Sequence, residues 1–461
     1  DMDQASGLTL TGGTITLAGG TTQTFPSGSG DTAAISSLIA GSGALTKAGA
    51  GNLSLSGAGN TFSGGTSISA GTLTVSGGNA LSDSGSVSVA SGATLALSDN
   101  EAVGNLSGAG SINLGNSTLS TNQSADTSFS GTISGNGGLT VSQSVSATYA
   151  LTLSGSNSYS GATTLLNYGW LKLNGEASIS NSSAVQVNGN SVLTLLSDQT
   201  IGSLASSAAT ASIQLGSYTL SAGGDNSSTT VAGVISGNGA LIKQGTGTLT
   251  LAGNNTYAGS TTVSAGTLSI ASDANLGAGS LILAGSTLDI SGATTIDNAI
   301  TLTGNSSIGN ASAVTLSSAI SGAYDLSKTG SGTLTLSASN SYGATYVNAG
   351  TLSVSSDANL GSGAVNLAAG TTLALTGATT IDNAIILGGN ATLAASANAT
   401  VSGVVSGAFT LTKTGASTLT LSGANTYGAT TVSAGTLSVA SDGNLGSGAL
   451  TLGAGTTLAV T

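Results

Sequence analysis

The chain has 461 residues, a formal net charge of −12 and only 5% charged residues, against roughly 25% in an ordinary soluble domain. It contains no histidine and no cysteine, which excludes a Ser-His-Asp or Cys-His nucleophile, a zinc site of the usual His/Cys kind and any disulfide. Nucleic acid is a poor partner, because neutralising phosphates requires clustered basic residues and this chain has only five scattered lysines, Lys47, Lys172, Lys243, Lys328 and Lys413.

The predicted elements are short β-strands that recur from one end of the chain to the other. Apolar–polar–apolar triplets stand beside glycine at residues 53–55, 73–75, 249–251, 268–270 and 334–336. Such period-two alternation, rich in Leu, Thr, Val and Ile, is typical of half-buried strands. The intervening Gly, Asn, Ser and Asp are typical of turns. Since no 3.6-residue apolar stripe is present, the sequence predicts an all-β chain.

The sequence also contains a longer repeat that spans several strands. Equivalent Leu-x-Leu triplets begin at Leu53, Leu151, Leu249, Leu334 and Leu419, so the copies occur in a long form followed by a short form. Four lysines each lie six residues before one of these leucines, and the second copy has Val145 there. We therefore predict N-terminal coils at 1–39 and five super-repeats at roughly 40–137, 138–235, 236–320, 321–405 and 406–461, the last of them incomplete.

Tandem copies of unequal length point to a solenoid. A closed barrel does not accept copies of two different lengths, because its strand number and shear must agree. A solenoid does accept them, since each coil contacts only its neighbours. Triplets about 20 residues apart predict roughly 22 coils stacked at about 4.8 Å each. We expect one continuous parallel β-helix, right-handed by the general rule for crossover connections.

The copies resemble a known repeat. Its residues here are Gly239-Ala240-Leu241-Ile242-Lys243-Gln244-Gly245-Thr246-Gly247-Thr248-Leu249-Thr250-Leu251, then Asn255-Thr256-Tyr257 and Ala265-Gly266-Thr267-Leu268. They resemble the passenger-associated strand repeat of bacterial autotransporters, which belong to the type V secretion class. The resemblance implies export through the outer membrane of a Gram-negative bacterium, with display on the cell surface or release. It also implies an outer-membrane translocator outside this chain.

The aromatic residue that follows each Leu-x-Leu triplet is a candidate ligand contact. These residues are Phe62, Tyr159, Tyr257, Tyr342 and Tyr427. They would either form a row of sugar-stacking platforms along one face or pack over a turn of their own coil, and the second interpretation is favoured. The lysines are expected about 19 Å apart along the solenoid, too far apart to cluster. They are interpreted as solvent-exposed charges that discourage sideways strand pairing.

Asp99 and Glu101 form the closest acidic pair outside the N-terminal end. On a strand they would face the same side. Paired carboxylates serve the β-helix enzymes that cleave polysaccharides, but no lysine or arginine lies nearby in the sequence. A Ca²⁺ site would need six to eight oxygen ligands. A solvated turn is therefore predicted at this pair, with no catalytic residue, metal or cofactor assigned anywhere in the chain.

The predicted function is non-enzymatic and structural. We expect an extracellular or surface-displayed adhesive β-solenoid that serves cell adhesion, aggregation or biofilm matrix and assembles with itself, end to end or laterally, into filaments. The alternative is an adhesin that binds glycans of a host or neighbouring cell through the five aromatic residues. A polysaccharide-cleaving enzyme would instead require acidic residues gathered in one groove.

Overall fold

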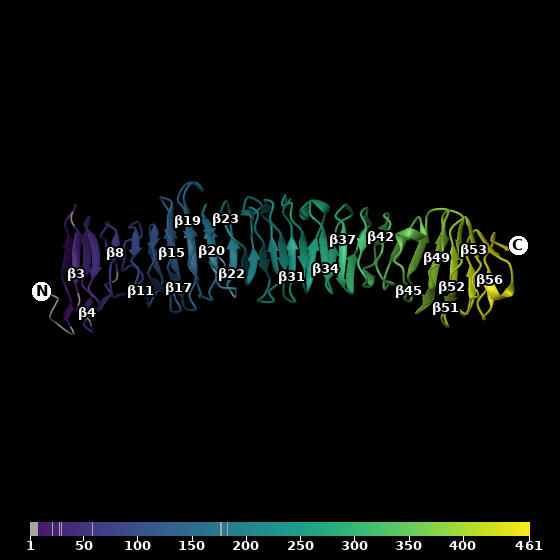
Figure 1. Ribbon diagram of the computed structural model, residues 1–461, viewed down its shortest axis with the longest axis horizontal. Helices are drawn as coiled ribbons and strands as arrows, with labels where there is room; N and C mark the ends of the chain where they lie inside the picture. Colours follow the sequence, from purple (N-terminus) through teal and green to yellow (C-terminus); the bar gives the residue numbers. More distant parts are fainter. Residues whose placement is uncertain are drawn as a thin grey trace. The chain divides into compact units, whose positions relative to one another are not determined.

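The computed structural model describes residues 8–20, 22–26, 28, 30–57, 59–175, 178–181 and 183–461. Within these residues the regular structure is β-strand, apart from three short 3-10 helices, η2 (Asp273–Asn275), η3 (Asp357–Asn359) and η4 (Asp442–Asn444). No helix in the described part of the chain is long and apolar enough to cross a membrane. The prediction of an all-β parallel solenoid is confirmed (Figure 1).

The chain divides into two compact units. The first contains the described residues up to Leu241 together with Gly253–Ala258, and the second contains Ile242–Ala252 and Gly259–Thr461. Each unit is a stack of coils whose strands pair in parallel with those of the preceding and following coils. The expected single continuous solenoid and its right hand stay predictions.

The first unit has three long sheets. The first sheet contains β1 (Leu8–Leu10), β4 (Thr32–Ile35), β7 (Asn52–Leu55), β9 (Thr72–Val75), β11 (Thr94–Leu97), β14 (Ser111–Asn113) and β17 (Thr132–Ser134). The second contains β3 (Thr22–Pro26), β6 (Ala44–Ala48), β8 (Thr66–Ile68), β10 (Val87–Val89), β13 (Leu106–Gly108), β16 (Thr127–Phe129), β19 (Ala150–Leu153), β21 (Trp170–Leu173), β23 (Val192–Leu195), β26 (Ser212–Gln214) and β29 (Val234–Ser236). The third contains β12 (Glu101–Val103), β15 (Leu119–Asn122), β18 (Leu139–Ser142), β20 (Thr163–Leu166), β22 (Ala184–Val187) and β25 (Ser203–Ala205).

Shorter pairings complete this part of the chain. The strand β2 (Thr14–Leu17) pairs with β5 (Leu38–Gly41), and β24 (Gln199–Ile201) pairs with β27 (Leu220–Ala222). The remaining strands are β28 (Thr229–Val231) and β30 (Leu241–Lys243), which contains the residue at which the first unit ends.

The strands of the second unit belong to four sheets. The first series is β31 (Thr248–Leu251), β33 (Thr267–Ile270), β35 (Thr287–Ile290), β38 (Ser306–Asn310), β41 (Leu326–Thr329), β43 (Thr345–Val347), β45 (Val365–Leu367), β48 (Ile385–Leu387) and β51 (Val405–Ser406). The second is β32 (Thr261–Val263), β34 (Leu281–Ala284), β37 (Ile300–Gly304) and β40 (Ile320–Ser321). The third is β36 (Thr294–Ile296), β39 (Val314–Leu316), β42 (Thr333–Leu336), β44 (Thr351–Val354), β46 (Thr372–Leu375), β49 (Ala391–Ala395), β52 (Leu411–Thr414), β54 (Thr430–Val432) and β56 (Leu450–Leu452). The fourth is β47 (Thr380–Ile381), β50 (Ala399–Val401), β53 (Thr418–Leu421), β55 (Thr436–Val439) and β57 (Thr457–Val460).

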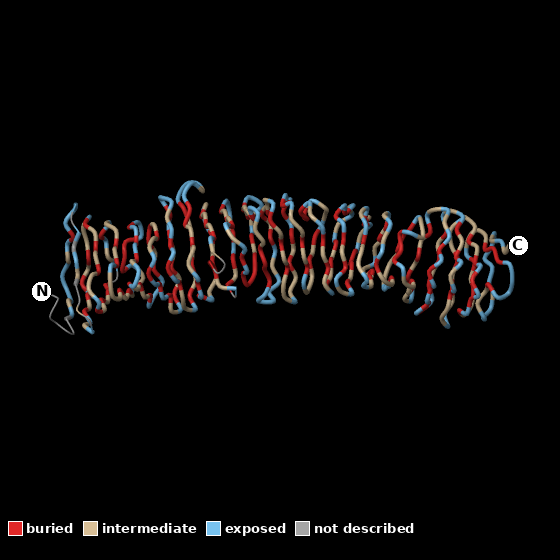
Figure 2. The backbone as a smooth tube through the Cα atoms, in the orientation of Figure 1, coloured by how far each residue is buried: buried red, intermediate tan, exposed pale blue. Residues whose placement is uncertain are grey.

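The core is a set of apolar ladders, one residue from each coil. Leu249 pairs with Leu268, Leu268 with Leu288 and Leu288 with Ile308, so each step along this ladder is one coil. All four side chains are buried. Because side chains alternate across a strand, the Thr or Ser between the two apolar residues of each strand points outward, as Thr250 does in β31 and Ser269 in β33. Figure 2 shows the resulting alternation of buried and more exposed residues.

Equivalent residues of successive super-repeats do not lie on one face. The fourth coil step from Leu249 along this ladder leads through Ile308 to Lys328. The equivalent of Leu249 in the next super-repeat is Leu334, which comes six residues after Lys328. Because of this offset, Leu334 lies on the next strand around the coil. The equivalent leucines Leu249, Leu334 and Leu419 are accordingly carried by β31, β42 and β53, which belong to three different sheets. The alternative of a row of aromatic platforms along one face, which was not the favoured interpretation, therefore finds no support in this arrangement.

Candidate functional site

The four repeat lysines are buried, so the prediction that they are exposed to solvent is wrong. The side chains of Lys47, Lys243, Lys328 and Lys413 are at most 1% exposed. The Nζ of Lys413 donates to four backbone carbonyl oxygens, those of Thr414 at 3.0 Å, Gly415 at 2.6 Å, Ser417 at 2.7 Å and Ala434 at 3.0 Å. We call this arrangement the lysine cage. It joins two coils, because Ala434 belongs to the coil that follows Lys413.

Local geometry explains why a cation occupies this place in the core. The residue two positions after the lysine is glycine with a positive φ, which is +81° at Gly415, a conformation that favours glycine. The turn directs several carbonyl groups inward, and an ammonium group supplies three donors for them. Burial lowers the pKa of all four lysines, that of Lys328 to about 8. Lys47, Lys243 and Lys413 each also donate to a carbonyl oxygen of the following coil and so join two coils. Lys328, in contrast, donates to the carbonyl oxygens of Thr329 and Gly330 in its own turn.

The second super-repeat replaces the lysine cage with a glutamine. Its loop between Leu139 and Leu151 is longer than the corresponding loop between Leu45 and Leu53. Val145 is 80% exposed, and the buried Gln143 donates from Nε2 to the carbonyl oxygens of Tyr149 at 2.6 Å and Tyr168 at 3.0 Å. Tyr168 occupies the position of the carbonyl that the caged lysine contacts on the following coil. The sequence did not reveal Gln143, because the longer loop displaces it from the lysine position.

The five candidate aromatic side chains lie inside the coils. Phe62, Tyr159, Tyr257, Tyr342 and Tyr427 are 0–2% exposed. The hydroxyl groups of three of them lie within hydrogen-bonding distance of buried threonines, as in the pair of Tyr342 and Thr345 at 2.9 Å. Burial raises the pKa of the Tyr342 phenol to about 12, against smaller opposing effects of its hydrogen bonds. This burial agrees with the favoured interpretation, in which the rings pack within the coils, and it speaks against the alternative of ligand contact because the core already surrounds them.

The acidic pair is split between the surface and the core. Asp99 is exposed and accepts a hydrogen bond from the Gly77 amide at 2.8 Å. Glu101 is 2% exposed and its carboxylate accepts bonds from the amides of Ala80 at 3.2 Å and Leu81 at 3.0 Å. The predicted solvated turn is thus wrong for Glu101, which begins β12 at an inward position. Among the described residues no group of three or more acidic side chains could hold a metal ion.

Burial of Glu101 predicts a pH-dependent stability. Desolvation raises the pKa of this carboxyl from 4.5 to about 7, with hydrogen bonds opposing the shift and Asp83 adding to it. The folded protein therefore retains a proton that the unfolded chain releases, and the stabilisation is present below about pH 4.5 and lost as the pH rises through about 7. We expect Glu101→Gln to remove about 3 kcal/mol of pH dependence from the free energy of unfolding.

Urea denaturation at several pH values between 4 and 8 measures this dependence. The matched control is Asp99→Asn, which neutralises the exposed carboxylate two residues away and should leave the pH dependence within about 0.5 kcal/mol of the unaltered protein. Equal pH dependence in the unaltered protein and in Glu101→Gln would show that Glu101 ionises as freely in the folded state as in the unfolded chain.

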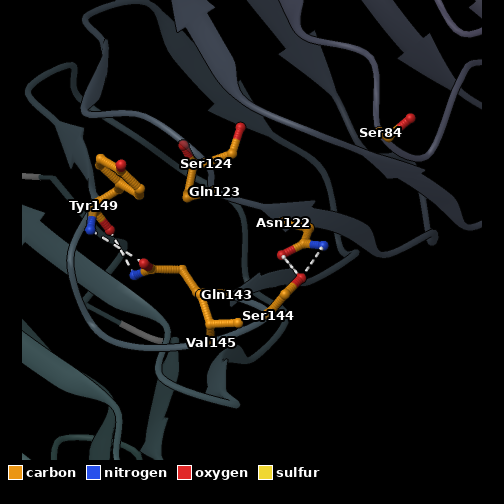
Figure 3. Close-up of a pocket in the computed structure, with 8 residues that line it drawn as sticks. All are labelled: Ser84, Asn122, Gln123, Ser124, Gln143, Ser144, Val145 and Tyr149. Atoms are coloured by element: carbon orange, nitrogen blue, oxygen red, sulfur yellow. Dashed lines mark hydrogen bonds between the residues drawn. The ribbon is translucent and has the colours of Figure 1, made fainter.

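The first unit also carries a surface pocket that the sequence did not reveal. Its volume is about 180 Å³. Figure 3 shows the lining residues, which are Ser84, Asn122, Gln123, Ser124, Gln143, Ser144, Val145 and Tyr149. They come from three separate stretches of sequence, brought together because consecutive coils stack. A second hollow of about 380 Å³ shares Ser84 and Asn122 with the first and is also lined by Asn60, Asn79 and Asp83.

Comparison with known proteins identifies the repeat. The passenger-associated-transport-repeat matches residues 45–75, 150–173, 241–270, 276–303, 326–354 and 411–439. This chain carries passenger-associated-transport-repeats. One match lies in each of the five predicted super-repeats, and the third super-repeat contains a further match at 276–303. Each match that begins at 45, 241, 326 or 411 contains a caged lysine and a buried ring, whereas the second begins at 150, after the loop that bears Gln143 and Val145.

An adhesin contains a related region. Over 291 residues, or 59% of this chain, the sequence is 33% identical to the adhesin BmaC autotransporter of Brucella suis biovar 1 (strain 1330). The matched region covers only 8% of that relative's length. No solved structure matches this chain.

Proposed function

We propose that this chain is an adhesive β-solenoid segment of an autotransporter passenger, exposed on the surface of a Gram-negative bacterium. The observation that carries the proposal is the passenger-associated-transport-repeat, which recurs in both units of the solenoid. The similarity to an autotransporter named as an adhesin supports it.

Surface display tests the proposal. The chain is fused to an autotransporter translocator and displayed on a non-adherent Gram-negative strain, and its exposure is verified with an antibody on intact cells. We expect the displaying cells to attach to cultured animal cells or to one another at least several-fold more than cells that display the translocator alone. Display at full level without a change in either kind of attachment would overturn the proposal.

Self-association is the narrower form of this function. If copies of the chain bind one another, displaying cells clump in the absence of animal cells, and electron microscopy of the purified chain shows assemblies that grow with concentration. Attachment to animal cells without clumping would instead assign adhesion to a ligand on the other cell. The five buried aromatic residues are no longer candidates for contacting such a ligand.

A further inference from the structure

The pocket of the first unit lies where the chain departs from its own repeat. The caged lysine is absent from the second super-repeat, and residues 143–149 precede the family match that starts at 150. These residues form one wall of the pocket, through Gln143, Ser144, Val145 and Tyr149. The longer loop therefore adds a surface feature that the other copies do not need for stacking their coils.

The loop presents a partly exposed aromatic ring at the pocket. Tyr149 is 41% exposed, in contrast to the buried tyrosines of the repeat. Its backbone is held on both sides by Gln143, whose Oε1 accepts from the Tyr149 amide at 3.1 Å and whose Nε2 donates to the Tyr149 carbonyl (Figure 3). Because this backbone is already held, it loses little freedom when a ligand packs on the side chain that it carries. Val145, which is 80% exposed, adds an apolar side chain to the lining of the pocket.

The rest of the pocket is polar and uncharged. Asn122 and Ser144 exchange hydrogen bonds at 3.1 and 3.3 Å. Gln123 is 3% exposed, and its Nε2 has no hydrogen-bond partner in the described structure, whereas its Oε1 accepts from the Thr127 hydroxyl at 2.9 Å. An unpaired buried donor costs about 1–3 kcal/mol. A small turn of this amide toward the pocket would let a ligand oxygen accept from it.

Charge and shape select the class of ligand. No lysine lines either hollow, and the one ionisable carboxylate, that of Asp83, is negative, so anionic ligands are disfavoured. An aromatic face surrounded by amides and hydroxyls matches a sugar, whose C–H face packs on the ring while its hydroxyl groups both donate and accept. Because the two hollows meet at Ser84 and Asn122, the surface accommodates more than one sugar unit.

We propose that this groove binds a neutral oligosaccharide, with Tyr149 packed against one sugar ring and the amides of Asn122 and Gln123 bonded to its hydroxyl groups. The inference rests on the proposed adhesive function, for which it names the class of partner. It places recognition where the loop of the super-repeat that lacks the lysine cage lies beside coils of the first super-repeat, which supply Ser84, Asn122 and Gln123. It also replaces the buried aromatic residues as the point of glycan contact.

The test is binding of the full purified chain to immobilised neutral oligosaccharides of glucose, galactose, mannose and N-acetylglucosamine, beside sialylated and sulfated glycans. A neutral glycan that binds is then titrated by calorimetry. We expect Tyr149→Ala to weaken its binding at least tenfold. The matched control is Tyr324→Ala, which removes a tyrosine of similar exposure, 45%, from the second unit and should leave the affinity within twofold.

Three results would overturn the inference: no neutral glycan binds, only anionic glycans bind, or Tyr149→Ala binds as well as the unaltered chain. Circular dichroism verifies that both variants stay folded. The proposal of adhesion and the proposal of glycan binding in the groove are overturned by different results. Displayed chains that attach to cells but bind no neutral glycan leave adhesion intact and remove the groove, whereas glycan binding without attachment of displaying cells removes adhesion and leaves the groove.

Discussion

Replacing Lys413 with methionine is expected to lower the free energy of unfolding by about 3–5 kcal/mol. Methionine fills much of the same space but donates no hydrogen bond. The four carbonyl oxygens that Lys413 contacts belong to the backbone and remain where they are. Removing the cation also removes the cost of burying a charge, a cost that is visible in the lowered pKa of the lysine. We expect the loss of the hydrogen bonds to outweigh that gain.

The matched control is Lys172→Met. Lys172 is half-buried and lies with its Nζ 4.3 Å from the centroid of the Trp170 ring, outside any lysine cage. Its replacement should cost only about 0.5–1 kcal/mol. Urea denaturation gives both values, and hydrogen exchange should show faster opening of β52 to β55 in Lys413→Met, since each coil of a solenoid depends on its neighbours. Equal stability losses in the two variants would show that the cage contributes nothing of its own.

The strands and their stacking could be predicted from the sequence because both leave a periodic signal. Leu249 and Leu251 alternate with threonines, and the apolar–polar–apolar triplet returns at Leu268 and again at Leu288, its partners in the next two coils. The family of the repeat was also recognisable, and its matches confirm it. The strands depend on the local alternation of apolar and polar residues, and the stacking and the family depend on the repeated copies. Both patterns can be read from a single sequence.

The inward positions of Lys47 and Glu101 are contained in the alternation of their strands, although both side chains were predicted to be solvent-exposed. Lys47 stands two residues after Leu45, and Glu101 two residues before Val103, so alternation places each charge on the inward face. The general preference of charged side chains for water outweighed that signal in the sequence-based interpretation. What identifies the lysine cage is the pair of features together, an inward lysine and a glycine two residues later.

The pocket and the rotation of the copies could not be predicted from local patterns. The pocket joins Ser84, Asn122 and Tyr149, which come together only when the coil register is known. The rotation depends on the short offset between Lys328, which lies four coils beyond Leu249, and Leu334, which is the repeat equivalent of Leu249. A small error in coil length hides this offset, and the sequence indicated coil length only approximately.

Replacing Tyr342 with alanine is expected to cost about 3–5 kcal/mol, as for other large buried aromatic side chains. The ring is fully buried and packs against the following coil so closely that a Cβ added at Gly361 would lie 2.6 Å from it. Alanine would leave a cavity there and would remove the partner of the buried Thr345 hydroxyl. Tyr342→Phe keeps the ring and should cost only about 1 kcal/mol for the lost hydrogen bond.

Tyr346 provides the matched control, because it lies four residues away on β43, points outward and is 37% exposed. Its replacement by alanine should change the stability by no more than about 0.5 kcal/mol. Thermal and urea denaturation of the three variants measure the order, with Tyr342→Ala the least stable, Tyr342→Phe intermediate and Tyr346→Ala near the unaltered chain. If Tyr342→Ala instead kept its full stability and lost attachment to cells, the ring would be a ligand contact, contrary to its place in the core.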